Sequence, residues 1–480
     1  MLFNSIQFLI FFVVVTTIYF ALPHRWRWLH LLIASCVFYA YFIPIYILIL
    51  FFTIVIDYAA GILIENAHGR RRKWYLVMSL VANVGVLAVF KYYNFFIDNV
   101  NLLIHGLGGG QAAGLAHLGI ILPIGLSFHT FQAMSYTIEV YRGHQRAERH
   151  FGIYSLYVMF YPQLVAGPIE RPQNVLHQFH ERHEFDFARV VTGLQRILWG
   201  LFKKVVVSDV CATYVNSIYN NYEVNTGLTL VFASAMFAIQ IYCDFSGYSD
   251  IALGTARVMG YELMENFKLP YFSKSISEFW KRWHISLSTW FRDYLYISLG
   301  GNRVSTGRRY FNLWFTFLVS GFWHGASWNF VIWGAIHGCY LIVGVWTKSW
   351  RRRLSDAVGL REGSWPDKAV NVACTFVLAT LAWVFFRATT FHQATSIIAG
   401  MCTPTHWLNL RIQDTGVFAA MIFGVTTMLL IEFFYLRRHN IEDITPARGW
   451  LRPVLFSTAL LLLIVQFGVS EGDQFIYFQF

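Results

Sequence analysis

The sequence predicts an all-α, polytopic integral membrane protein with about eleven transmembrane helices, plus shorter re-entrant or interfacial helices. Charged residues make up 13% of its 480 residues, against about 25% in an ordinary soluble domain. Hydrophobic residues make up 56%, and the mean hydropathy is +0.47. The apolar runs are continuous and do not alternate over roughly ten residues, as the strands of a membrane barrel would. Helices therefore account for the length of the chain.

The net charge of +11 has the pattern of a membrane protein. Basic residues cluster in short stretches between apolar runs, where they orient helices in a bilayer. We therefore expect these basic residues to contact a lipid bilayer and not nucleic acid. The cysteines are far apart and form no CxxC pair, so we interpret them as small buried hydrophobes. They are Cys36, Cys211, Cys243, Cys339, Cys374 and Cys402.

The first apolar run, Ile6–Leu22, predicts a membrane helix that is not cleaved. Residues 1–5 contain no Lys or Arg, and no small-x-small site follows the run. The next run, Leu29–Ile64, is too long for one span, and Pro44 divides it into two helices. Two further crossings are predicted at Trp74–Ile97 and Leu118–Val140.

The distribution of basic residues predicts the topology. Basic stretches at 24–27, 70–73 and 142–149 are each separated by two crossings, so all three lie in the cytoplasm and the N-terminus lies outside. Near the other end, the basic stretch at 348–353 is also expected inside. The predicted crossings that follow it place the C-terminus outside; they are Val370–Phe386, Gly416–Tyr435 and Val454–Val469.

The middle of the chain, about 152–310, is less regular. Tyr154–Val165 is too short to span comfortably, and Leu228–Tyr242 is a slightly short span. The latter runs into Cys243–Asp250, a polar stretch with two carboxylates, which we expect to break the helix. Such a break either lines a cavity or forms a loop that caps the next helix at Ser249 or Asp250, and both interpretations stay open.

Three histidines in this region, His177, His180 and His183, lie on a polar stretch. They have no clear acidic or cysteine partner at metal-ligand spacing. A solvated surface is therefore favoured over a metal centre, and we predict no metal ligand. The sequence shows neither an internal repeat nor a linker that would divide it.

Residues 276–338 combine polar groups with apolar segments and are the predicted site of chemistry. On a helix, large apolar residues from 279 to 291 recur at three- and four-residue spacing and form one face. We expect this helix at an interface or a cavity rim. His284 lies near the edge of the face and close to Lys281, Arg282 and Arg292; it is either a packed or a catalytic histidine. The face consists of Phe279, Trp280, Trp283, Leu287, Trp290 and Phe291.

His324 lies in an apolar run with no Asp, Glu, Lys or Arg between Tyr310 and Trp346. An ionised residue at that depth costs roughly 2.5 kcal/mol or more, which a neutral histidine partly avoids. Histidine also titrates near working pH, which suits proton transfer. Nearby glycines permit close approach of another backbone or a thin ligand. Trp323 and Trp328 are expected to keep the site dry, although a buried structural role for His324 stays open.

A basic loop separates the two histidines in sequence. It contains Asn302 and Arg303, followed by Arg308 and Arg309. It could hold a phosphate-rich cofactor from the cytoplasm, but an ordinary inside loop would have the same composition.

Six segments, in this order, resemble the membrane-bound O-acyltransferase family and its bacterial, alginate O-acetyltransferase-like branch. The resemblance covers most of the chain. The segments are LPIGLSFHTFQAMSYTIEVYRG (122–143), YPQLVAGPIER (161–171), IQIYCDFSGYSDIALG (239–254), FWKRWHISLSTWFRDYLYISLGGNR (279–303), SGFWHGASWNFVIWGAIHG (320–338) and FIYFQF (475–480).

The resemblance implies a single membrane domain over 1–480, with a catalytic core at about 120–340 and a funnel on each side. It implies that His324, in the WHG motif, is the catalytic histidine and that His284 is the second active-site residue. It further implies acetyl-CoA as a cytoplasmic donor substrate, with no permanently bound cofactor. The acceptor would be an exported polysaccharide, served by a periplasmic, SGNH-hydrolase-like acetyltransferase. The protein would then lie in the bacterial inner membrane with both termini in the periplasm.

The mechanism we expect is direct acyl transfer. Neutral His324 removes a proton from an acceptor hydroxyl, and His284 orients a substrate or stabilises the oxyanion. A covalent intermediate on Ser or Cys is the alternative chemistry. Other acceptors within the family are peptidoglycan, cellulose and, for D-alanyl transfer, teichoic acid; a transporter is the competing class. The residues expected to bind the donor are Lys281, Arg282, Arg292, Asn302, Arg303 and Trp323.

Overall fold

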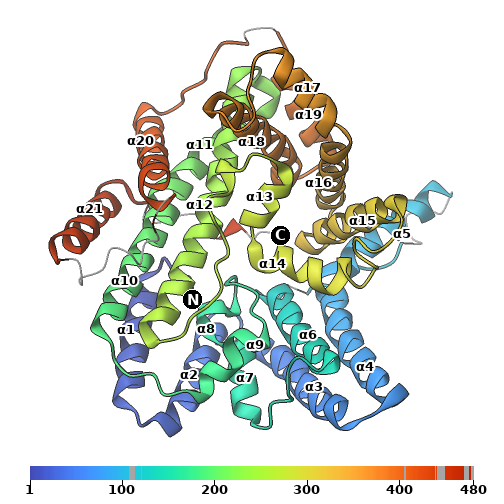
Figure 1. Cartoon of the computed structure of the whole chain (residues 1–480), viewed down its shortest axis with the longest axis vertical. Helices are drawn as coiled ribbons and strands as arrows, with labels where there is room; N and C mark the ends of the chain where they lie inside the picture. Colours follow the sequence, from blue (N-terminus) through green and yellow to red (C-terminus); the bar gives the residue numbers. More distant parts are fainter. Residues whose placement is uncertain are drawn as a thin grey trace. The chain divides into compact units, whose positions relative to one another are not determined.

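The computed structural model describes residues 1–107, 114–120, 122–404, 407–437, 439, 449–469 and 475–476. Helices make up all the regular structure in these ranges, which contain no strand, so the predicted all-α class is confirmed (Figure 1). The chain divides into two compact units. The first comprises Met1–Ile197 and Ile251–Met264, and the second comprises Leu198–Asp250 and Glu265–Phe480.

Six helical stretches are long and apolar enough to cross a membrane, within the residues that the structure describes. Two shorter apolar helices, Ile6–Ala21 and Leu451–Phe467, lie near the ends of the chain. These features confirm a multi-pass membrane protein; the count of about eleven crossings stays a prediction. The six stretches are Pro44–Asn66, Gly69–Gly106, Leu228–Met259, Trp328–Trp346, Trp365–Arg387 and Thr415–Phe434.

The first unit begins as the sequence predicts. Pro44 starts a short 3₁₀ turn, Pro44–Tyr46, that divides the long apolar run. Gly69–Gly106 extends beyond the predicted Trp74–Ile97 crossing at both ends, and the basic cluster at 70–73 lies inside its first turns. The helices of this unit are α1 (Ile6–Ala21), α2 (His24–Ala40), α3 (Ile47–Asn66), α4 (Gly69–Leu87), α5 (Tyr93–Gly106), α6 (Leu126–Arg142), α7 (Phe151–Met159), α8 (Tyr161–Leu164) and α9 (Pro172–Val175).

The predicted crossing at Leu118–Val140 begins too early. The helix, α6, starts only at Leu126, after Gly125 in a left-handed conformation with φ of 78°. Residues 114–120 instead lie along α5, where two asparagine side chains bind their backbone. Asn94 donates to the Leu118 carbonyl at 3.0 Å and accepts from the Leu118 N–H at 2.9 Å. These bonds replace the intrahelical hydrogen bonds that a longer helix would have made.

The second unit carries both predicted catalytic histidines. Its helices are α11 (Asp209–Tyr219), α13 (Ile276–Arg282), α14 (Ile285–Trp290), α15 (Thr306–His324), α16 (Trp328–Trp346), α17 (Lys348–Ala357), α18 (Trp365–Arg387), α19 (Phe391–Met401), α20 (Thr415–Ile431) and α21 (Leu451–Phe467). Two helices, α10 (Phe187–Leu201) and α12 (Leu228–Met259), contribute to both units.

The predicted helix break at Cys243–Asp250 is wrong, as are both interpretations of it, because α12 is continuous over 32 residues. Its carboxylates are paired with lysines of Phe202–Ser208, the helical segment between α10 and α11. Lys204 Nζ lies 2.7 Å from Asp244 and 2.8 Å from Asp209, and Lys203 pairs with Asp250. Buried charges are tolerated when they are paired in this way. The polar stretch therefore packs inside the unit as helix.

Candidate active site

His284 is placed by a break in the helix that the sequence predicts over 279–291. α13 ends at Arg282, α14 starts at Ile285, and His284 takes a left-handed conformation with φ of 43°. The prediction of one continuous helix is therefore wrong. The predicted apolar face is nevertheless buried, since each of its six residues is at most 8% exposed. Left-handed backbone is uncommon for residues other than glycine and persists where the surroundings enforce it.

The enforcing element is an irregular segment around Asn266, which pairs with the chain on both sides of His284. The Lys268 N–H donates to the Arg282 carbonyl, and the Ile285 N–H donates to the Asn266 carbonyl, both at 2.9 Å. The Asn266 side chain, 1% exposed, continues this contact. Its Oδ1 lies 3.1 Å from His284 Nδ1 and accepts a 2.9 Å hydrogen bond from the Ser286 hydroxyl.

His324 is the last residue of α15, and glycines let α15 and α16 approach closely around it (Figure 1). A Cβ on Gly321 would stand 2.2 Å from the Phe330 carbonyl oxygen. A Cβ on Gly325 would stand 2.2 Å from the Phe330 ring. The expectation that glycines admit a second backbone beside His324 is thus confirmed at Gly321.

The two histidines are neighbours inside the second unit. Their ring centroids are 6.5 Å apart, and His284 and His324 are 0% and 4% exposed. Burial lowers the pKa of His284 to about 3, so this imidazole is neutral across the physiological range. A pair of buried imidazoles with one of them held neutral is suited to moving a proton.

Aromatic rings surround this histidine pair. Trp323 and Trp333 each lie 5.0 Å from His324 between centroids, and Phe386 lies at 5.5 Å. Phe245 contacts His284 at 4.6 Å. Trp328, which the sequence predicts as a second wall, is the first residue of α16 and is 57% exposed.

His337 belongs to the same aromatic cluster but has a different environment. Its Nδ1 accepts a hydrogen bond from Trp280 Nε1 at 3.2 Å, and its ring lies 4.9 Å from that of Trp333. The side chain is fully buried. These contacts suit a histidine that packs the wall behind His324.

The predicted donor-binding residues divide into two groups. Trp323 lies beside the histidines, at 6.4 Å from His284 between ring centroids. The others lie at exposed or half-buried positions, three of them with partners: Arg282 pairs with Glu278, Arg292 with Asp293, and Asn302 accepts from Tyr296. Lys281 and Arg303 are exposed. The structure thus brings together only Trp323, His284 and His324.

Several residues of the site do not stand out in the sequence. Asn266 and Phe245 come from segments about 20 and 40 residues before His284, and Phe386 comes from α18. The chain end also reaches this region: the Ile476 N–H donates to Asp244 Oδ2 at 2.7 Å, and Phe475 lies 5.6 Å from Phe245. The sequence marks two of these segments in advance, 239–254 with Phe245 and the FIYFQF motif with Phe475, whereas Asn266 and Phe386 lie in none of the six.

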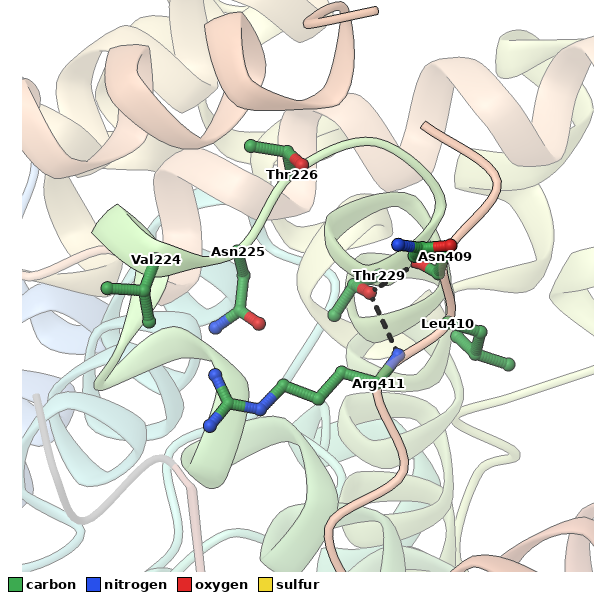
Figure 2. A pocket seen from close by; sticks show the side chains of 7 residues that line it. All are labelled: Val224, Asn225, Thr226, Thr229, Asn409, Leu410 and Arg411. Atoms are coloured by element: carbon green, nitrogen blue, oxygen red, sulfur yellow. Dashed lines mark hydrogen bonds between the residues drawn. The ribbon is translucent and has the colours of Figure 1, made fainter. Parts of the chain in front are cut away.

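A pocket of about 510 Å³ lies elsewhere in the second unit (Figure 2). Figure 2 shows the Arg411 guanidinium turned toward Asn225, while Thr229 bonds the backbone of 409 and 411. Neither His284 nor His324 lines it. The lining residues are Val224, Asn225, Thr226, Thr229, Asn409, Leu410 and Arg411.

Comparison with known proteins bears on this site. Residues 142–387, which include both histidines, match the model of the membrane-bound O-acyltransferase family. A probable alginate O-acetylase of Pseudomonas putida is 36% identical over the full length of both chains. A peptidoglycan O-acetyltransferase of Helicobacter pylori is 33% identical over 95% of this chain and 92% of its own. A teichoic acid D-alanyltransferase of Bacillus subtilis is 26% identical over 57% of this chain and 71% of its own.

Proposed function

Because the chain belongs to the membrane-bound O-acyltransferase family, and is therefore a membrane O-acyltransferase, we propose that it moves acetyl groups from cytoplasmic acetyl-CoA across the membrane. The acetyl groups serve the O-acetylation of an exported polysaccharide. The observation that carries the chemistry is the buried His284–His324 pair, with 6.5 Å between ring centroids. The acceptor class follows the similarity to alginate O-acetylases over the whole chain.

In the proposed reaction, neutral His324 acts as general base. It takes the proton of an acceptor hydroxyl, whose oxygen attacks the thioester carbonyl. The tetrahedral intermediate collapses with cleavage of the C–S bond, and His324 returns the proton to the departing CoA thiolate. The aromatic rings around His324 keep bulk water out, which limits hydrolysis of the thioester. His284 acts on the same reacting groups as a substrate-orienting residue.

The donor would approach from the cytoplasm. Trp323 would pack against its acyl end, while Lys281, Arg282, Arg292, Asn302 and Arg303 would contact its phosphates. Guanidinium groups suit phosphate because their donors match its oxygens, although Arg282 and Arg292 would first have to exchange their carboxylate partners. The exposed cation of Arg303 is accordingly the principal candidate among the arginines.

The acceptor side is proposed to face the periplasm of a bacterial inner membrane, with both chain termini on that side. A periplasmic, SGNH-hydrolase-like acetyltransferase would complete the transfer to polysaccharide. Peptidoglycan is the second candidate acceptor, because a peptidoglycan O-acetyltransferase is 33% identical over most of both chains. An alginate-like polymer is favoured by the somewhat higher identity of 36% over both full chains.

The test is acetyl transfer from radiolabelled acetyl-CoA by the purified protein in detergent, beside His324→Ala. The matched control is His129→Ala, a buried histidine of the first unit. We expect His324→Ala to abolish transfer while remaining folded by size-exclusion chromatography, and His129→Ala to retain it. Equal activity of wild type and His324→Ala would overturn the assignment of the base. Activity with D-alanyl carrier protein but not with acetyl-CoA would overturn the donor.

A further inference from the structure

The Asn266 side chain has only one orientation that its neighbours accept. One of its terminal atoms lies 3.3 Å from the Ser286 backbone N–H, which can only donate, so this atom is the carbonyl oxygen Oδ1. The other terminal atom lies 3.3 Å from the Ser249 hydroxyl, which accepts from the amide Nδ2. The hydrogen-bond network therefore settles which end of the amide faces His284.

This orientation determines where His284 carries its proton. Oδ1 of Asn266, the atom 3.1 Å from His284 Nδ1, has no hydrogen, so Nδ1 must donate. A neutral imidazole has a single N–H group, and its second nitrogen is then an acceptor. Nε2 of His284 consequently presents a lone pair.

We propose that Asn266 is a positioning residue that holds His284 in the Nδ1–H tautomer, so that Nε2 accepts a hydrogen bond from a second hydroxyl of the acyl acceptor, next to the one whose proton His324 takes. This inference rests on the proposed reaction, in which His284 either stabilises an oxyanion or orients the acceptor. Stabilising an oxyanion requires an N–H donor, and neutral His284 has already given its own to Asn266. Orienting the acceptor through a second hydroxyl, while the reacting O–H donates to His324, requires a lone pair, which Nε2 has.

The surroundings prevent an easy change of tautomer. Asn266 is 1% exposed and His284 is 0% exposed, so bulk water does not reach the shared contact to take the place of Oδ1. The Asn266 carbonyl also accepts the Ile285 N–H, which ties the backbone on one side of the left-handed residue. One asparagine thus orients the imidazole through its side chain and holds its backbone through its main chain.

The direct test is ¹⁵N NMR of the protein labelled at histidine, because protonated and unprotonated ring nitrogens have well-separated shifts. The His284 signals are assigned by subtracting the spectrum of His284→Gln. We expect a protonated Nδ1 and an unprotonated Nε2 at neutral pH. A protonated Nε2, with or without a protonated Nδ1, would overturn the proposal. This measurement needs no variant of Asn266 to fold.

The kinetic test compares two substitutions at Asn266. Asn266→Leu removes Oδ1, whereas Asn266→Asp keeps an oxygen at that position. We expect Asn266→Leu to lower kcat by about 10- to 100-fold with little change in the KM for acetyl-CoA, and Asn266→Asp to recover most of this loss. Asn225→Leu, at a buried asparagine of the Figure 2 pocket, is the matched control and should leave kcat unchanged. Equal losses in both Asn266 variants would contradict a role through the oxygen.

A pH profile separates positioning from a merely structural role. In Asn266→Asp, the ionised carboxylate would stabilise the imidazolium of His284 and raise its pKa, so the acid limb of kcat/KM should move to higher pH. A change in folding alone would lower the profile without moving it. An Nδ1–H signal in a protein without acyltransferase activity would refute the proposed function and leave the tautomer assignment intact. Acyltransferase activity together with a protonated Nε2 would support the proposed function and refute the tautomer assignment.

Discussion

The Cα of Gly334 lies 2.9 Å from the point where a Cβ on Gly321 would stand. This approach joins α15 and α16 immediately before His324, the last residue of α15. Small residues allow such contacts between helices in membranes, where van der Waals packing replaces the hydrophobic effect as the force of association. The position of the proposed catalytic base therefore depends on two residues without side chains.

The substitution Gly321→Ala should destabilise the protein and displace His324. The new methyl group would stand 2.2 Å from the Phe330 carbonyl oxygen, so the two helices must separate. Overpacking of this kind costs about 1–3 kcal/mol. Thermal unfolding in detergent should show a lowered Tm, together with reduced acetyl transfer. Gly344→Ala on α16, where a Cβ meets nothing within 4 Å, is the control and should leave both unchanged. Similar effects of the two substitutions would refute the packing argument.

Removing the Lys204 ammonium should be among the most destabilising single changes in the second unit. Lys204→Met leaves the buried carboxylates of Asp209 and Asp244 without their shared cation, a loss of about 3–5 kcal/mol. Adding Asp244→Asn should restore part of the Tm, because one unpaired charge disappears. Arg352→Met, which breaks the more exposed pair with Asp356, should cost at most about 1 kcal/mol. No recovery in the double variant would argue against the ion pair.

The contribution of His284 to the stability of the protein should decrease as the pH is lowered from 7 to 5. Its pKa is about 3 in the fold and about 6.5 in the unfolded chain, so the unfolded state binds the proton first. The stabilisation is present above pH 6.5 and decreases below it, by about 2 kcal/mol at pH 5. The measurement is Tm against pH for wild type and His284→Gln. We expect the Tm of the variant to rise relative to that of wild type as the pH falls from 7 to 5; parallel curves would show that His284 is not the group that titrates.

Donor binding should depend on Arg303. Arg303→Glu places a like charge near the donor phosphates and should raise the KM for acetyl-CoA about two- to fivefold without changing kcat, since a surface ionic contact contributes up to about 1 kcal/mol. The effect should diminish at high salt, because exposed charges are screened. Arg411→Glu, in the pocket of Figure 2, provides a matched charge reversal and should leave this KM unchanged. A KM unaffected by Arg303→Glu would remove the basic loop from the donor site.

The sequence determined the class of the protein and much of its helix pattern. Continuous apolar runs and a low charge content are local properties, and the structure confirms the helices that they predict, including the break at Pro44. The burial of the apolar face from Phe279 to Phe291 also follows from local sequence, although the predicted helix is interrupted at His284. The WHG and WHISLSTW motifs marked His324 and His284 before their proximity was known.

Only the tertiary structure decided how the polar groups within this framework are satisfied. The stretch at Cys243–Asp250 predicts a helix break because it is polar and carries two carboxylates beside apolar segments. Lys203 and Lys204, about 40 residues earlier, pair with these carboxylates inside a continuous helix. The helix over 279–291 was interrupted by Asn266, which competes for the backbone beside His284. Apolar burial can be read from neighbouring residues because it depends mainly on their composition. A hydrogen bond or an ion pair depends on a single distant partner, so the chain must fold before that partner, and with it the proton on His284, is determined.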